Sequence, residues 1–206
     1  MHSMNITRRF AILGALALPG CSAIARLNAA AEPRDTFDLR AVNLTQQGAV
    51  DRRNLLVADP SAAAALDTDR ILIRPEPQTI AYLPDARWSD DLPRLFQTLL
   101  VQSLSSTGQI GFVGIPNAGP VPDVVLLSRI DRFDVEVDET VGFRAVFACT
   151  CTLLRDRDQR VIRTQRFAQS IAVSTDNPLT IARAFQALLD ETLPEIVIWT
   201  TAGALS

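Results

Sequence analysis

The side chains that most often carry enzyme chemistry are scarce in this sequence. Its single histidine, His2, precedes a segment that we expect to be removed, so the mature chain would contain no imidazole. Nucleophiles activated by histidine, histidine general bases and histidine metal sites are excluded on that ground. The chain also lacks a G-x-x-x-x-G-K-S/T motif and a G-x-G-x-x-G after a strand, the glycine patterns that bind nucleotide phosphates. We therefore expect no enzyme, no cofactor and no metal site.

Carboxylates offer the remaining route to catalysis or metal binding. Asp67 and Asp69 before Arg70 could belong to a catalytic or metal site, but a turn with a structural ion pair at Arg70 is favoured. A second acidic stretch consists of Asp131, Asp134, Glu136, Asp138 and Glu139. It lacks the spacing of an EF-hand, which favours a solvated strand end over a calcium site. A carboxylate-dependent hydrolase is the least favoured alternative, because nothing in the sequence singles out one pair of acids.

Three residues ahead of the first predicted helix have the types that are enriched in binding hot spots. Tyr82, Arg87 and Trp88 could together form a surface for a partner or a ligand. The structural alternative is that Trp88 packs beneath the helix while Arg87 pairs with a nearby carboxylate. We favour this alternative and keep the binding surface as a hypothesis.

Cys149 and Cys151 are two residues apart in a predicted strand, so their side chains share one face. A disulfide between them is awkward, because an extended strand places the two Cα atoms near the upper limit of disulfide reach. A metal site would need further ligands, which the mature chain does not offer. The pattern predicts plain core thiols.

The N-terminus has the features of a lipoprotein signal peptide. Arg8 and Arg9 precede a short apolar run over 10–18, which is too short to span a bilayer. The run ends in Leu-Pro-Gly-Cys at 18–21, a pattern that resembles a lipobox, in which the cysteine thiol receives a diacylglycerol and the chain is cut before it. Two or more acyl chains on Cys21 would anchor the protein stably to a membrane. The alternative is a buried cysteine in an ordinary first helix.

This interpretation divides the chain into a signal peptide over 1–20, a lipidated tether over 21–36 and a domain over 37–206. Ser22 after the lipidated cysteine favours the outer membrane over the inner membrane. The pair Arg8 and Arg9 leaves both the general secretory route and the twin-arginine route open.

Composition and patterning predict one α+β domain behind the tether. The chain has 206 residues, 48% of them hydrophobic, which is enough for one core. Its net charge of −3 and the lack of a basic stripe argue against a nucleic-acid partner. A mostly antiparallel sheet packed by two main helices is the expected architecture.

The elements follow from hydrophobic periodicity and from turn residues. One helix is predicted over 89–107 with Ser89 as its N-cap, and a second starts after Asn177 and is kinked or interrupted at Pro194. A loop is expected over 41–53. Short strands are predicted at 37–39, 54–58, 70–75, 79–83 and 110–113, of which those between 54 and 83 should form hairpins or a meander. Long strands over 123–137, 141–154 and 159–173 should form an antiparallel meander.

Several short motifs, in a fixed order along the chain, resemble the ABC-type transport auxiliary lipoproteins, the PqiC-like family. Each motif is weakly specific alone, while their order and spacing together are more so. The resemblance covers nearly all of the mature chain. The motifs are the lipobox at Cys21, Phe-Asp-Leu at 37–39, Leu-Asp-Thr-Asp-Arg-Ile-Leu at 66–72, Ile-Ala-Tyr at 80–82, Ala-Arg-Trp at 86–88, Leu-Pro-Arg-Leu at 92–95, Ala-Phe-Gln-Ala at 184–187 and Val-Ile-Trp at 197–199.

The resemblance implies a periplasm-facing lipoprotein that works with an ABC transporter permease and an MCE-domain protein. Such systems move lipids or other hydrophobic molecules between the two membranes of the envelope, and the lipoprotein itself catalyses no reaction. We therefore expect a non-catalytic subunit that docks to the periplasmic part of the transporter. The main alternative is a stand-alone lipid-binding lipoprotein, which would need an apolar cavity. The transported substrate and a homo-oligomeric state are left open.

Overall fold

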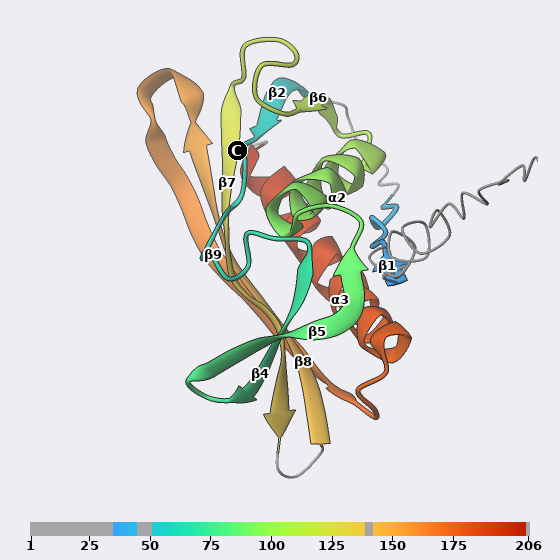
Figure 1. The fold of residues 1–206 in the computed structure, drawn as a ribbon. Helices are drawn as coiled ribbons and strands as arrows, with labels where there is room; N and C mark the ends of the chain where they lie inside the picture. The colour runs from blue at the N-terminus through green and yellow to red at the C-terminus, as the bar shows by residue number, and fades with distance from the viewer. Residues whose placement is uncertain (1–34, 45–50, 139–141, 205–206) are drawn as a thin grey trace, which may run out of the picture. The chain divides into compact units, whose positions relative to one another are not determined.

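A computed structural model describes residues 35–44, 51–138 and 142–204 (Figure 1). The predicted signal peptide, Cys21 and most of the predicted tether lie outside these residues. A short 3₁₀ turn (Asp156–Asp158) joins the last two strands. The elements are, in order, β1 (Asp35–Phe37), β2 (Asp51–Val57), β3 (Ser61–Ala62), β4 (Arg70–Glu76), β5 (Thr79–Trp88), α2 (Leu92–Ser106), β6 (Ile110–Gly114), β7 (Val124–Asp138), β8 (Gly142–Arg155), β9 (Arg160–Val173) and α3 (Pro178–Ala204).

The long strands β7, β8 and β9 form the antiparallel meander that the sequence predicts. Val124 of β7 pairs with Arg155 of β8, and the pairing continues to Asp138 opposite Gly142. One irregularity interrupts it, where Ile130 lies opposite Cys149 but Arg132 lies opposite Ala148. This bulge gives Asp131 no partner in the register and shifts the side chains that follow it relative to β8. The α+β class and the mostly antiparallel sheet are confirmed.

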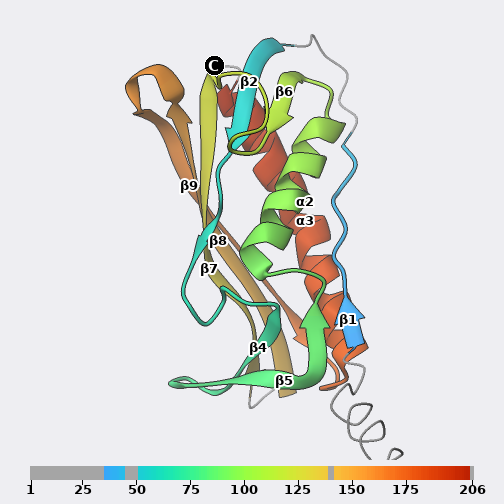
Figure 2. The ribbon, with the colours of Figure 1, turned by 45° about the horizontal axis from the view of Figure 1, so that its top comes forward.

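The chain from β2 to β4 follows one edge of β7, and here the prediction of hairpins is partly wrong. β2, β3 and β4 all pair parallel with β7, at 124–126, 129–130 and 134–136 respectively. Figure 2 shows this part of the chain running beside β7. Pro60 and the turn at 63–66 interrupt the path without reversing it, so no hairpin forms between β2 and β4. Only β4 and β5 form the predicted hairpin.

The short outer strands complete the sheet. β6 pairs parallel with the far side of β2, and β1 pairs parallel with β5. The strand predicted at 37–39 is therefore present but lies at Asp35–Phe37. β2 begins at Asp51, inside the range that we expected to be a loop.

The first helix begins later than predicted. α2 starts at Leu92 because β5 continues through Trp88, and its N-cap is Asp91 without a side-chain hydrogen bond to the helix. Ser89 is therefore not the cap, and its Oγ donates to Asp38 Oδ1 at 2.6 Å. The predicted apolar stripe is buried, from Leu92 to Leu104.

The last helix is longer than predicted. Asn177 Oδ1 accepts hydrogen bonds from the backbone N–H groups of Leu179 (3.0 Å) and Thr180 (3.3 Å), and Pro178 occupies the first helical position. Pro194 does not interrupt the helix, which continues to Ala204. The helix tolerates the proline because its last turns are held by packing, with residues from Ile196 to Ala204 among its buried side chains.

Both helices cover the same face of the β7–β8–β9 meander (Figures 1 and 2). Between them and the sheet lies an aromatic cluster. The rings of Phe133 and Phe185 stack with centroids 4.3 Å apart, and Trp88 meets both rings edge-on. Phe147 contacts Phe133 and Phe96, so the cluster joins both helices to the sheet. Of the helices described, none is both long and apolar enough to cross a membrane.

Candidate functional site

The three residues of the predicted binding surface separate in the structure. Trp88 is 1% exposed and belongs to the aromatic core, so it is not part of a surface, and this element of the hypothesis is corrected. Arg87 is exposed; its Nη1 lies 3.7 Å from Asp69 Oδ2 and its Nε donates to Thr36 Oγ1. Tyr82 is half-buried and donates its hydroxyl to the carbonyl of Ala65. The structural alternative describes Trp88 and Arg87 correctly.

The acids around Arg70 also have structural contacts. The guanidinium of Arg70 lies over the ring of Tyr82, 4.1 Å from its centroid. The ion pair that we expected at Arg70 is made instead by Arg87 with Asp69. The reason is the β4–β5 pairing, which places Arg70 opposite Arg87 and directs the two cations to different partners.

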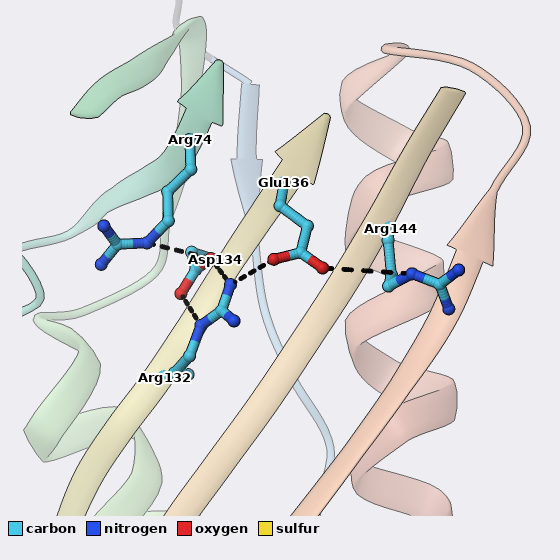
Figure 3. Close-up of polar contacts among 5 residues, drawn as sticks. All are labelled: Arg74, Arg132, Asp134, Glu136 and Arg144. Carbon is cyan, nitrogen blue, oxygen red and sulfur yellow. Dashed lines mark hydrogen bonds and ion pairs between the residues drawn. The ribbon is translucent and has the colours of Figure 1, made fainter. Parts of the chain in front are cut away.

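A network of five charged residues lies where β4, β7 and β8 meet (Figure 3). Arg132 and Asp134 come from β7, and Arg132 donates from Nε to Oδ1 at 3.0 Å and from Nη2 to Oδ2 at 2.5 Å. Arg74 of β4 adds a second cation, 3.3 Å from Asp134 Oδ2. The Asp134 side chain is 0% exposed, and a buried carboxylate is stable only when it is paired in this way.

Glu136 extends the same network toward β8. Its Oε2 accepts a hydrogen bond from Arg132 Nη2 at 2.8 Å, and its Oε1 lies 4.0 Å from Arg144 Nε. The hydrogen bond with Asp134 raises the pKa of Arg132 above its ordinary value, although burial acts in the opposite direction. A pocket of about 340 Å³ beside the network is lined by two arginines, Arg74 and Arg132, and two glutamates, Glu76 and Glu136. Its charges balance, which suits a structural network better than a calcium site.

Asp131, at the β7 bulge, has charged and polar partners of its own, outside the five-residue network. It accepts hydrogen bonds from Arg129 Nε at 2.6 Å and Thr150 Oγ1 at 2.7 Å, and Arg166 lies 3.9 Å away. Burial would raise the pKa of Asp131, but the hydrogen bonds from Arg129 and Thr150 outweigh it, and the pKa is lowered. Asp131, Asp134 and Glu136 are therefore all bound to arginines. Glu139 and the side chain of Asp138 lie outside the described residues.

The two cysteines are core thiols, as predicted. Both are 0% exposed, and neither takes part in a disulfide. Their sulfurs lie 4.0 Å apart. The hydrogen bond with Cys151, and then burial, raise the pKa of Cys149, which keeps this thiol protonated and unreactive.

A second open feature is a groove of about 950 Å³ along α2, which sequence reasoning missed. We call it the α2 groove. One wall is the outer side of α2, and the other is formed by β6 and the loop after it. The lining residues are Asp59, Pro60, Asp67, Asp91, Pro93, Arg94, Gln97, Thr98, Val101, Gln102, Phe112, Gly114, Ile115, Ala118 and Gly119. They come from four separate segments, so no local motif could have revealed the groove.

Glycines hold the aromatic wall of the α2 groove in place. A Cβ atom at Gly114 or at Gly119 would lie 2.4 Å from Cε1 of Phe112. Gly119 also has φ +117°, which side-chain-bearing residues rarely adopt. The Phe112 ring therefore lies directly on the two glycines and remains 36% exposed, and its neighbour Ile115 is 42% exposed.

The floor of the α2 groove contains one buried amide. Gln97 is 7% exposed, and its Nε2 donates to the carbonyl of Val57 at 3.0 Å and to Asp59 Oδ1 at 2.9 Å. No donor within the described residues reaches its Oε1. The three acids of the rim differ from those on β7: across the described part of the chain, no arginine pairs with Asp59, Asp67 or Asp91.

The side chains of the described residues are better suited to binding another molecule than to catalysing a reaction. The acids on β7 are held by arginines, and within 35–44, 51–138 and 142–204 no three acidic, histidine or cysteine side chains gather as a metal site would require. The α2 groove combines exposed apolar side chains with carboxylates that pair with no described arginine. Such a surface is suited to binding another molecule.

Solved structures share this fold. A Xanthomonas campestris protein of the DUF330 family is 24% identical with a TM-score of 0.75, and the match covers 82% of this chain and 96% of that one. An uncharacterised protein is 15% identical with a TM-score of 0.64, covering 82% and 99%. A Chlamydia trachomatis protein is 9% identical with a TM-score of 0.52, covering 75% and 98%. At these identities the similarity establishes the fold alone.

The sequence itself identifies the family. Among curated proteins none matches this chain. The family model for the ABC-type transport auxiliary lipoprotein component matches residues 37–197, a range that contains every described strand and helix except β1 and the last turns of α3. The match extends over well more than half of the chain, and the chain therefore belongs to the ABC-type transport auxiliary lipoprotein component family.

Proposed function

We propose that this protein is a non-catalytic, lipid-anchored subunit of an ABC-type transport system that includes an MCE-domain protein. It would serve the movement of lipids or other hydrophobic molecules between the two membranes of the envelope. The observation that carries the proposal is the family match over residues 37–197. The contacts of the described residues support a docking role, since the α2 groove offers exposed apolar and acidic side chains while the β7 acids are held by arginines.

The anchor in this proposal is a lipid on Cys21, facing the periplasm, with the outer membrane favoured by Ser22. Substituting Cys21→Ser removes the thiol that would be acylated, so the protein should move from the membrane fraction to the periplasmic fraction. Fractionation followed by immunoblotting measures this change. Cys149→Ser is the matched control, because that thiol is buried in the sheet, and the variant should stay with membranes. Membrane association of Cys21→Ser would contradict the anchor.

The transport assignment is tested by the proteins that accompany the full-length chain. Affinity purification from detergent-solubilised membranes, followed by mass spectrometry, should recover an MCE-domain protein or an ABC transporter permease. An unrelated outer-membrane lipoprotein with the same tag serves as the control for non-specific recovery. Recovery of the chain alone, from membranes in which other envelope complexes stay intact, would contradict the assignment.

The α2 groove favours a second candidate, in which the protein itself carries a lipid. A volume of about 950 Å³ and exposed Phe112 and Ile115 could accommodate acyl chains. Native mass spectrometry of the purified protein tests this candidate directly. A bound lipid that disappears in Ile115→Asp would support it, and a protein of the bare polypeptide mass would count against it.

A further inference from the structure

We infer that the α2 groove is the docking site for a basic, amphipathic segment of a partner protein. The inference rests on the proposed function in taking this partner to be a subunit of the transport system. It adds the docking face and the chemistry of the partner's segment, neither of which follows from the family.

The first argument is charge. Three carboxylates line the groove, at Asp59, Asp67 and Asp91, while Arg94 is the one cation among its lining residues. Arg94 is already compensated, since its Nε lies 3.7 Å from Asp90, which is not part of the lining. The positive end of α2 contributes about half a unit charge, which offsets only part of the excess. The groove is therefore negative and attracts a cationic ligand.

The contrast with β7 strengthens this argument. There, each described acid lies within 4 Å of at least one guanidinium, as Asp131, Asp134 and Glu136 show. Of the described arginines, none pairs with the three groove acids. Basic side chains of a partner could form ion pairs with the groove acids, as the arginines of this chain do with the acids of β7.

The second argument is the apolar content and the shape of the groove. Phe112 and Ile115 present exposed apolar surface on one wall, and Pro93 and Val101 lie on the other. From Pro93 to Gln102 the groove follows about 14 Å of α2, a length that accommodates about nine residues of helix or about four of extended chain. The Gln97 Oε1 is an acceptor without a donor among the described residues, which a guanidinium, an ammonium or a backbone N–H can supply.

The same charges disfavour a phospholipid. Its phosphate would lie in a groove lined by three carboxylates, and like charges brought together in this way repel. A peptide segment with basic residues on one side and apolar residues on the other matches both properties of the groove.

The inference is tested by crosslinking in cells that make the full-length lipoprotein. A photoreactive amino acid is placed at Thr98 or Gln102, both exposed lining residues, and the crosslinked peptide is sequenced by mass spectrometry. Ser105 is the control position, because it is exposed on α2 but does not line the groove. We expect a peptide that carries apolar residues together with Arg or Lys. An acidic or uncharged peptide, a crosslinked lipid, or a yield no higher than at Ser105 would overturn the inference.

Charge variants supply the second readout. Neutralising the groove acids together, as Asp59→Asn, Asp67→Asn and Asp91→Asn, should lower the crosslinking yield about tenfold, because three exposed ion pairs change an affinity by roughly that factor. The matched control neutralises three exposed acids elsewhere, as Asp176→Asn, Glu191→Gln and Glu195→Gln, and should leave the yield unchanged. Equal yields from both triple variants would overturn the role of charge.

Failure of this inference is distinguishable from failure of the proposed function. If transport subunits co-purify but the groove positions give no crosslink, the partner binds another face and only the docking site is wrong. If the groove crosslinks to a basic segment of a protein unrelated to transport, the docking chemistry stands and the transport assignment is wrong.

Discussion

At the scale of residues, the surroundings of each carboxylate decide what it can do. Asp134 is fully buried between Arg132 and Arg74, both of which pair with its carboxylate. Asp131 is partly exposed and held by Arg129 and Thr150. Asp67, on the rim of the α2 groove, pairs with no described arginine. A carboxylate on β7 therefore holds strands together, while a carboxylate on the groove is available to another molecule.

The lowered pKa of Asp131 makes its contribution to stability depend on pH. The folded-state pKa lies below the unfolded value of about 3.9, so the contribution is present above about pH 4 and is lost as the pH falls through the folded-state pKa. We expect Asp131→Asn to lower the free energy of unfolding by about 1.5–3 kcal/mol at pH 7, the usual range for hydrogen bonds to a charged group. Urea unfolding between pH 7 and pH 2.5 measures the difference between variant and wild type.

A suitable control for this experiment is Asp176→Asn, at an exposed acid that makes no ion pair among the described residues. Its effect should be small and constant with pH. A difference between wild type and Asp131→Asn that persists unchanged at pH 2.5 would show that the charge of Asp131 is not the cause.

At the scale of elements, the starts of the two helices depend on a capping side chain to different degrees. α3 begins at a complete cap, in which Asn177 Oδ1 serves two backbone N–H groups. α2 begins at Asp91 with no such bond, and the end of β5 at Trp88 sets its start instead. The beginning of α3 should accordingly be the more sensitive of the two to its cap residue.

We expect Asn177→Ala to lower the free energy of unfolding by about 1 kcal/mol, the usual cost of losing an N-cap. Thermal unfolding followed by circular dichroism measures it. The cap residue of α2 provides the comparison, since Asp91→Ala removes no capping hydrogen bond and should cost less. A larger loss of stability in Asp91→Ala than in Asn177→Ala would contradict the prediction that α3 depends on its cap residue more than α2 does.

Sequence patterns predicted the elements better than their partners. The apolar stripe of α2 and the alternation through Cys149 and Cys151 follow from local periodicity, which is visible in any window of the chain. The parallel pairing of β2 with β7 joins residues about seventy positions apart, and local patterns carry no information about it. The α2 groove was missed for the same reason, because residues such as Asp59 and Gly119, sixty positions apart, line the same groove only after folding. For Trp88, the favoured prediction of packing beneath the helix was correct, but its partners Phe133 and Phe185 lie far along the chain and could not be predicted from local patterns.

At the scale of the whole molecule, the aromatic core connects elements that lie far apart in the described chain. Trp88 belongs to β5, Phe133 to β7 and Phe185 to α3, and their rings are in mutual contact. If one of these three elements unfolds, the aromatic rings of the other two become exposed to solvent. The sheet and the helices of the described region should therefore unfold together.

Tryptophan fluorescence tests this cooperativity. The chain has two tryptophans, so the variant Trp199→Phe leaves Trp88 as the only reporter of the core. We expect the fluorescence emission of Trp88 and the far-ultraviolet circular dichroism of this variant to change at the same urea concentration, as in a two-state transition. A fluorescence change that precedes the loss of circular dichroism would mean that the core opens before the sheet.

The position of β7 in the chain also affects when the fold can be completed. β2, β3 and β4 all lie along one edge of a strand that is synthesised after them, beginning at Val124. Until the ribosome has made that strand, β2, β3 and β4 lack the partner that they share, and contacts between distant residues form slowly. A nascent chain of this design cannot complete its sheet until β7 has been made, and an incompletely folded chain is the form that a secretion channel for unfolded polypeptides accepts. The topology that delays folding would thus keep the protein competent for translocation.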